Sequence, residues 1–207
     1  AANGQTGTLL LDPENITISD GATSDSGLVN STDGTIALAN GSGTETVNQQ
    51  NLESVGATTN IILHASNSIT INDLSDDLLD LQQTSGNSVL FKANNGAITF
   101  NDLSDEIRTQ GGVIEFNAGG SLTLGKLNSN GGKITLTGVG VNIGGDILTG
   151  GKDFIVDAGT GAYNQHSNII VTTAGDNAEI TADTFNLLFG FTGSGGNIFG
   201  IPSSIVT

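Results

Sequence analysis

The sequence predicts an all-β protein that forms a single elongated domain, a parallel β-solenoid, and three observations support this prediction. Short apolar strands recur about once every 20–29 residues between positions 61 and 157. A repeat of that length is too short for a strand–helix–strand crossover, which needs roughly 30 residues or more, but it fits one coil of a solenoid. Glycines and asparagines stand between the strands, and only 4% of the residues are aromatic. The core must therefore consist of aliphatic side chains that stack coil upon coil.

Residues 1–60 are expected to form the first coil and an excursion from it. Positions 9–11 and 16–18 have the composition of short strands, and a proline between them forces a break. Positions 19–45 are polar and rich in Gly, Ser and Asp, which predicts a loop that carries one short strand. Positions 45–56 space their apolar residues loosely at helical intervals and stop at a glycine, which predicts a short helix or turn.

Residues 61–184 are expected to form the regular coils. In these strands apolar residues flank a central threonine, so the flanking side chains point inward and the threonine points outward. Successive coils pair in parallel roughly 4.8 Å apart, so equivalent positions form ladders along the axis. A threonine ladder can form an ice-binding face, but that function needs two outward columns, and ordinary β-propensity explains a single one. The predicted outward threonines are Thr70, Thr99, Thr123 and Thr135.

The last segment, residues 185–207, differs from the coils because it combines phenylalanines with many glycines. The end of a solenoid exposes a cross-section of the core and unpaired strand edges, so something must cover it. The tail is therefore predicted to be a cap or an interface. Together with an uncovered first coil, it would join copies or neighbouring modules end to end. The predicted interface residues are Phe185, Phe189, Phe191 and Phe199.

The charge balance narrows the choice of partners. Five Lys/Arg against 21 Asp/Glu give a formal net charge of −16, which disfavours nucleic acids and anionic lipid surfaces. No apolar run approaches the roughly 20 residues that a membrane-spanning helix needs. The absence of Cys excludes disulfides and thiolate metal sites. The chain begins at Ala1 without a charged-then-apolar leader, which indicates a removed leader or an excerpt of a longer protein.

The sequence Asn-Asp-Leu-Ser-Asp occurs twice, at 72–76 and at 101–105. The offset is one coil, so the copies should lie above one another and bring several carboxylates within a few ångströms. Oxygen-ligated Ca²⁺ would relieve their repulsion. Alternatively, the Asn and Asp side chains cap turns while the other carboxylates are solvated. The sequence contains no known calcium-loop pattern, which favours this alternative. The candidate calcium ligands are Asp73, Asp76, Asp77, Asp102, Asp105 and Glu106.

No catalytic constellation is recognisable, so an enzymatic role is not expected. His64 follows an inward-pattern strand and is expected to be structural, whereas His166 has no partnered acid at a suitable spacing and is expected to lie in a loop. A polysaccharide-active enzyme is the competing possibility, because such enzymes place carboxylates in a groove on a β-helix. Asp146, Asp153 and Asp157 are the candidates for such a group, and solvated turns explain them better.

Several stretches share an order of strands and turns with one known family. They are Leu52-Glu53-Ser54, Asn60-Ile61-Ile62-Leu63-His64-Ala65, Ile69-Thr70-Ile71-Asn72-Asp73-Leu74, Ile107-Arg108-Thr109-Gln110-Gly111-Gly112, Gly144-Gly145-Asp146-Ile147 and the strand pair at 9–18. Together they resemble the filamentous-haemagglutinin-type exoproteins of two-partner secretion, in particular the large cyanobacterial surface proteins. The resemblance covers about residues 8–180. It implies a right-handed parallel β-helix that is exported from a Gram-negative cell, often by a dedicated outer-membrane partner.

These observations together predict a secreted, non-enzymatic structural or adhesive protein that forms a rigid rod or filament on a Gram-negative cell surface. No cofactor is required, and calcium is the one candidate. The expected partners are further copies or neighbouring modules of a longer exoprotein, glycans, and the outer-membrane secretion partner. A polysaccharide-active enzyme and a calcium-dependent carbohydrate-binding module are the alternatives.

Overall fold

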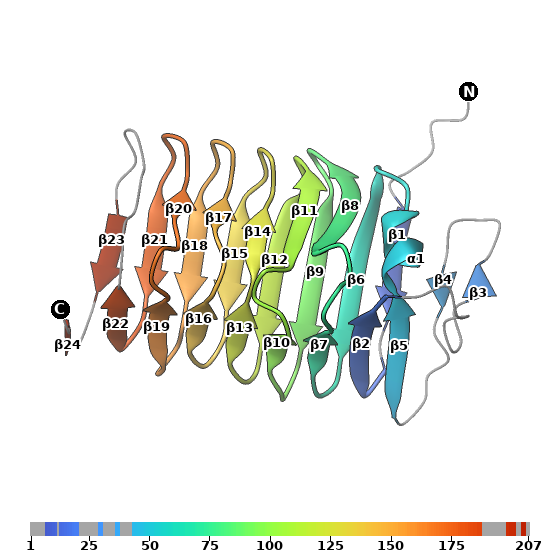
Figure 1. The fold of residues 1–207 in the computed structure, drawn as a ribbon, viewed down its shortest axis with the longest axis horizontal. Helices are drawn as coiled ribbons and strands as arrows, with labels where there is room; N and C mark the ends of the chain where they lie inside the picture. The colour runs from blue at the N-terminus through green and yellow to red at the C-terminus, as the bar shows by residue number, and fades with distance from the viewer. Residues whose placement is uncertain are drawn as a thin grey trace.

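The computed structural model is a parallel β-solenoid of about five turns, as the repeat predicts (Figure 1). Each full coil contributes one strand to each of three parallel sheets. The structure describes residues 7–11, 13–20, 29–30, 36–37, 43–187, 198–201 and 204–205.

The three sheets are numbered here in the order in which a coil visits them. Sheet 1 has the spatial order β1 (Gly7–Leu11), β6 (Thr59–Ala65), β9 (Ser88–Ala93), β12 (Val113–Ala118), β15 (Ile134–Thr137), β18 (Phe154–Asp157), β21 (Ala178–Thr181) and β23 (Ile198–Ile201). Sheet 2 has the order β24 (Ser204–Ile205), β22 (Thr184–Leu187), β19 (Ala162–Gln165), β16 (Val141–Ile143), β13 (Leu122–Leu124), β10 (Ile98–Phe100), β7 (Ile69–Ile71), β2 (Asn15–Ser19) and β5 (Thr44–Asn48). Sheet 3 has the order β20 (Val171–Thr172), β17 (Ile147–Leu148), β14 (Lys126–Asn128), β11 (Glu106–Gln110) and β8 (Leu78–Thr84).

The core is one continuous cluster of side chains that alternate inward along the short strands. Ile61 pairs with Val89 and Ile114 pairs with Ile134, so each inward position repeats in the next coil and forms a buried ladder. The rings of Phe91 and Phe116 stack within one such ladder at a centroid distance of 4.6 Å, with an interplanar angle of 5°. The aliphatic core with few aromatic residues is therefore as predicted.

The outward threonine ladder differs from the prediction in one member. Thr70, Thr99 and Thr123 are in register in sheet 2, but Thr135 lies in sheet 1, where it pairs with Glu115. The assignment of Thr135 to this ladder is wrong, because Ile-Thr-Leu and Ile-Thr-Ile have the same alternation whichever sheet holds them. The local pattern decides which side chains point inward, not which sheet receives the strand.

Close packing between coils requires glycine at several corners, including corners where the backbone angle is ordinary. A Cβ atom on Gly132 would lie 2.1 Å from the carbonyl oxygen of Gly112 in the preceding coil. Gly132 has no positive φ. Gly150 has both a positive φ of +64° and a close contact, because its Cβ atom would lie 2.7 Å from the backbone nitrogen of Gly131. Stacked corners thus bring one backbone onto the next at a distance that leaves no room for a side chain.

A second ladder, which the sequence analysis missed, consists of buried hydroxyl groups at the corner after sheet 3. The side chain of Thr109 donates a hydrogen bond to the carbonyl of Gly112 at 2.8 Å, three residues later along the chain. The same bond closes the corner in each following coil. The hydroxyl donors are Thr109, Ser129, Thr149 and Thr173, all of them buried.

The excursion after the first coil forms a cover at the amino-terminal end of the solenoid. It contains the antiparallel pair β3 (Val29–Asn30) and β4 (Ile36–Ala37), then β5, then the short helix α1 (Gln49–Glu53), as the sequence predicts for 45–56. β5 adds a parallel strand to the free edge of β2, α1 packs beside the edge of β8, and β4 contacts β1. The expectation of an uncovered first coil is therefore wrong.

Side chains of α1 take the place of a neighbouring strand at the edge of sheet 3. Gln49 Nε2 donates to the carbonyl of Leu78 at 2.5 Å, and Glu53 Oε1 accepts from the N–H of Asp80 at 2.9 Å. These bonds satisfy backbone groups of β8 that an open edge would leave unpaired.

At the carboxy-terminal end, β22 to β24 continue sheets 1 and 2. Phe185 of β22 is buried, and its ring lies 6.3 Å from that of Tyr163 in the preceding coil, so it is part of the core. Phe199 lies in β23, whose backbone alone is described, and Phe189 and Phe191 lie outside the described residues.

Candidate functional site

The two copies of Asn-Asp-Leu-Ser-Asp form the turns that lead from sheet 2 to sheet 3. The leucine of each copy anchors its turn on the core, Leu74 fully and Leu103 partly buried. The side-chain amide of Asn101 donates to Asn72 Oδ1 at 2.9 Å. The copies therefore begin one above the other, as the offset of the repeat predicts.

The register changes by one residue within this turn. β10 pairs with β7 as Ile98 with Ile69, whereas β11 pairs with β8 as Glu106 with Leu78. The first turn therefore holds one more residue than the second, and Asp77 in this turn adopts a left-handed φ of 56°. This shift places the end of the second turn beside Asp77 and not beside Asp76, which the repeat alone would align with it.

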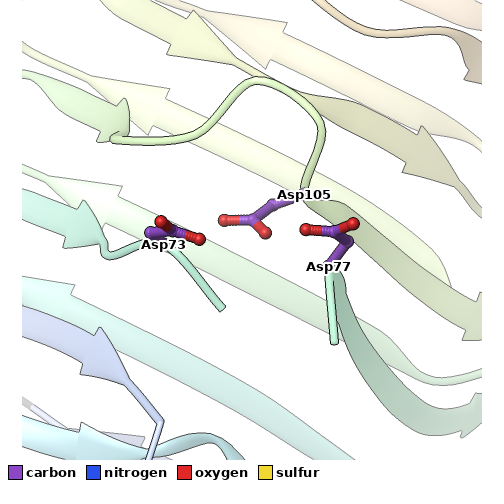
Figure 2. Close-up of side chains that lie close together, drawn as sticks. All are labelled: Asp73, Asp77 and Asp105. Atoms are coloured by element: carbon purple, nitrogen blue, oxygen red, sulfur yellow. The ribbon is translucent and has the colours of Figure 1, made fainter. Parts of the chain in front are cut away.

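Three carboxylates converge at the shifted turn (Figure 2). One carboxylate oxygen from each of Asp73, Asp77 and Asp105 lies within 4.8 Å of the other two. Asp105 is fully buried, while Asp73 and Asp77 are exposed. Burial raises the pKa of Asp105 to about 6, and the negative charges of Asp102, Asp73 and Asp77 act in the same direction. The N–H of Leu74, 3.4 Å from both carboxylate oxygens of Asp105, opposes the shift.

This group of Asp73, Asp77 and Asp105, the carboxylate trio, has the chemistry of a hard-cation site. Ca²⁺ takes six to eight oxygen ligands, and three carboxylates can supply up to six of them. The exposed positions of Asp73 and Asp77 leave room for water as further ligands. Because like charges at this distance repel, the trio can hold either a cation or a shared proton.

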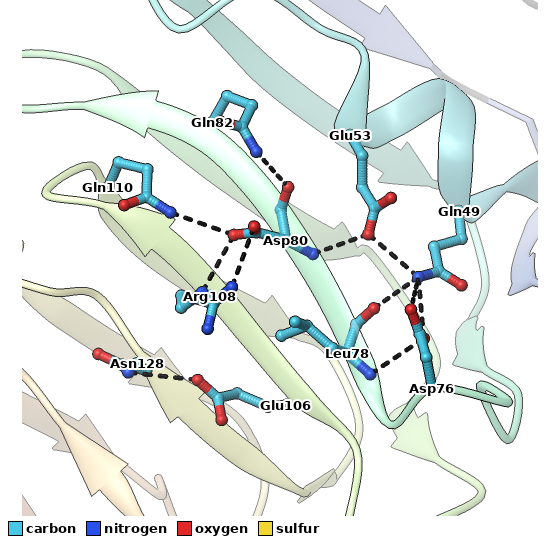
Figure 3. Close-up of polar contacts among 10 residues, drawn as sticks. All are labelled: Gln49, Glu53, Asp76, Leu78, Asp80, Gln82, Glu106, Arg108, Gln110 and Asn128. Carbon is cyan, nitrogen blue, oxygen red and sulfur yellow. Dashed lines mark hydrogen bonds and ion pairs between the residues drawn. The ribbon is translucent and has the colours of Figure 1, made fainter.

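Two of the other predicted ligands are engaged in bonds along sheet 3 (Figure 3). Asp76 accepts from Gln49 Nε2 at 3.1 Å, on the side of the turn that faces α1. Glu106 accepts from the side-chain amide of Asn128 at 3.2 Å, one coil further on. Neither carboxylate belongs to the trio.

Asp102 forms a capped turn, which is the alternative that the sequence left open. Its Oδ1 accepts from the hydroxyl of Ser104 at 2.6 Å and from the N–H of Ser104 at 2.8 Å. The hydroxyl bond, followed by the backbone bond, holds the pKa of Asp102 below its usual value. The two copies of one sequence motif thus use their first aspartate differently.

The sequence analysis missed an ion pair on the outward face of sheet 3 (Figure 3). Arg108 binds Asp80 through two nitrogens, with Nη2 3.0 Å and Nε 3.1 Å from the carboxylate oxygens. Gln110 Nε2 donates to the same carboxylate at 3.1 Å. The hydrogen bond from Arg108 is the main cause of the lowered pKa of Asp80. The separation of 28 residues, equal to the register of β8 and β11, is the sequence signal that could have revealed the pair.

The two histidines lie at different sheets. His64 lies in β6, in register with Lys92, whereas His166 is an exposed residue that follows β19 of another sheet. Tyr163, close to His166 in sequence, points into the core, where its hydroxyl donates to Gln165 Oε1 at 3.2 Å. Burial raises the pKa of the Tyr163 hydroxyl, so it stays protonated.

The remaining acidic candidates each accept a hydrogen bond from a different turn. The backbone N–H donors are Ile170 for Asp146 at 2.9 Å, Asn177 for Asp153 at 3.3 Å, and Gly159 for Asp157 at 2.9 Å. Among the residues that the structure describes, the trio is the one group of three His or acidic side chains close enough to share a metal ion.

The chain matches no protein-family model, no curated protein and no solved structure. In the part of the chain that the structure describes, no helix has the length and apolar character that a membrane span requires. The fold and its side chains therefore carry the functional argument.

Proposed function

We propose that this chain is a stiff, non-enzymatic structural module of a secreted surface protein. The observation that carries the proposal is the unbroken parallel pairing of strands in three sheets around one core. Each added coil extends such a stack by about 4.8 Å without a hinge, so the molecule resists bending. The side-chain bonds of α1 at the edge of β8 add to this, because they tie the first described coils together.

The resemblance to filamentous-haemagglutinin-type exoproteins supports the location that we propose. The chain would be right-handed, exported from a Gram-negative cell with the help of an outer-membrane partner, and displayed as an adhesin whose polar faces meet glycans. The net charge of −16 favours solubility and attraction of cations at such a surface. Antibody labelling of intact and lysed source cells tests the location, and labelling of lysed cells alone would contradict it.

Joining of modules is proposed at the carboxy-terminal end, because the amino-terminal end is covered by β5 and α1. A variant that lacks residues 188–207 keeps the coils through β22, where Phe185 packs on the preceding coil. We expect the full chain to form longer particles than this variant in electron microscopy and light scattering. Equal particle lengths, with both proteins folded by circular dichroism, would rule out joining through the tail.

A calcium-dependent role is the second candidate, and the carboxylate trio is the specific observation that favours it. Bound Ca²⁺ would replace the repulsion among the carboxylates of Asp73, Asp77 and Asp105 by three attractive contacts. The melting temperature should then rise with millimolar Ca²⁺ and return to its starting value with EDTA. The control is Asp102→Asn, which lies outside the trio and should keep the response to calcium. An unchanged melting temperature of the wild type would contradict calcium binding.

The competing enzymatic function has less support from the geometry. A polysaccharide-active enzyme needs carboxylates gathered along a binding groove. Here the acidic side chains at 146, 153 and 157 serve separate turns. Release of reducing sugars from a panel of acidic and neutral polysaccharides is the direct assay, and activity that Asp105→Asn abolishes would favour the enzyme.

A further inference from the structure

The outward face of sheet 2 differs in composition from the rest of the surface. Two columns of outward positions run along eight neighbouring strands, from β5 to β22. The central column contains Thr46, Thr17, Thr70, Thr99, Thr123, Asn142, Asn164 and Asn186. The column two residues earlier contains Thr44, Asn15, Ser68, Ala97, Ser121, Gly140, Ala162 and Thr184. These sixteen residues are called the neutral face.

No residue of the neutral face carries a charge, although the chain has a net charge of −16. The outward positions of the other sheets include charged side chains, such as Lys92 and Glu115 on sheet 1 and Asp80 and Arg108 on sheet 3. Glu45, the charged residue of β5, is in register with an inward position. Two copies of this chain therefore meet the least repulsion when their neutral faces approach each other.

The side chains of the neutral face are small, so none of them projects far above the backbone of sheet 2. Within the described residues, the hydroxyls of Thr70, Thr99 and Thr123 make no hydrogen bond and remain available to a partner. The amides of the central column form their own ladder, in which Asn186 donates to Asn164 at 2.6 Å. In-register parallel sheets with small, uncharged side chains can mate face to face with interdigitated side chains.

The area of the neutral face suits a weak or multivalent contact. Seven intervals of about 4.8 Å give a length of about 34 Å, and two columns about 7 Å apart give a width of about 15 Å with their side chains. The buried area is then about 500 Å² for each copy and about 1,000 Å² in total, close to the lower limit for a specific interface. Pairing of this size becomes effective when several modules align along two neighbouring rods.

We propose that the neutral face of one molecule pairs with the neutral face of a second copy, so that the rods associate side by side. A contact that uses the same patch on both copies is closed by a twofold axis and has no tendency to grow beyond two rods. The acidic turns that follow the strands, at Asp73 and Asp102, form the rim of the contact. Salt screens the repulsion between these rims, so high ionic strength should favour pairing. Lateral pairing does not depend on joining at the ends, and either can fail without the other.

The absence of native cysteine makes a single-cysteine test straightforward. Thr99→Cys places a thiol in the middle of the neutral face, and Asn117→Cys places one on the outward face of sheet 1 as a matched control. The full chains are oxidised with diamide in 0.5 M salt at increasing concentrations. We expect disulfide-linked dimers of the Thr99→Cys protein to form about tenfold faster than those of the control. Equal rates would overturn the proposal.

A second measurement uses charge and leaves the thiol chemistry aside. Thr99→Glu buries a carboxylate at a paired face and should weaken self-association in sedimentation equilibrium by about tenfold or more, while Asn117→Glu should leave it unchanged. Circular dichroism verifies that both variants fold. Equal association of the two variants would overturn the proposal, as would a wild-type chain that remains monomeric and instead adsorbs through this face to ice or to a crystalline polysaccharide.

Discussion

Replacing Asp105 by asparagine tests whether ionisation of this buried carboxylate lowers the free energy of unfolding. The carboxyl of Asp105 has a pKa of about 6 in the folded protein, against about 3.8 for an exposed aspartate. Between about pH 4 and pH 6 the folded state therefore binds more protons than the unfolded state. The contribution of Asp105 to the free energy of unfolding falls as the pH rises through this window, and at pH 7 the ionised group destabilises the fold.

The magnitude follows from the shift of the pKa. About two pKa units at about 1.4 kcal/mol each give an upper limit of about 3 kcal/mol at pH 7. Asp105→Asn keeps the acceptor for the N–H of Leu74 and offers an amide donor to Asp73 and Asp77. We therefore expect Asp105→Asn to be more stable than the wild type at pH 7, by at most about 3 kcal/mol, and to have no advantage at pH 4.

The assay is urea unfolding with EDTA present, at pH 4 and at pH 7, followed by circular dichroism. Asp102→Asn is a control that should change the stability in the opposite direction. The bonds from Ser104 lower the pKa of Asp102, so removal of this carboxylate should destabilise the protein at pH 7. If Asp105→Asn is no more stable than the wild type at pH 7, the ionised carboxylate of Asp105 does not destabilise the fold, and the electrostatic reasoning for the trio is wrong. If the trio binds Ca²⁺, the variant should also lose the stabilisation by calcium.

Three further predictions concern the stability of the solenoid. Glu53→Ala removes the acceptor for a backbone N–H of β8 and should cost about 1–3 kcal/mol in urea unfolding, whereas the exposed neighbour Gln50→Ala should change little. Ser129→Ala leaves a buried corner carbonyl without its donor and should also cost about 1–3 kcal/mol, with Ser129→Thr restoring most of the loss. Ala174→Gly, at a position with a φ of 50°, should stabilise the protein by about 1 kcal/mol, and a destabilised glycine variant would contradict the strain argument.

The sequence predicted one element of the cover at the amino-terminal end, the short helix. The short helix within 45–56 was predicted from its apolar spacing and its terminal glycine, and α1 occupies Gln49–Glu53. Its role at the edge of β8 was not predictable, because Gln49 and Glu53 reach residues that lie 27 to 29 positions later in the chain. A local pattern specifies a helix but says nothing about which distant backbone its side chains will contact.

By itself, the sequence determined the solenoid, the aliphatic core and the alternation of inward and outward side chains. These follow from a period of two along each strand and from the recurrence of short strands, and both properties are local. The tertiary structure decided which residues meet across coils. Because coil length varies from 20 residues between Ile114 and Ile134 to 28 between Ile61 and Val89, a position cannot be carried from one coil to the next by counting. One extra residue before β8 brings Asp77 beside Asp105, and the assignment of each strand to its sheet excludes Thr135 from the neutral face.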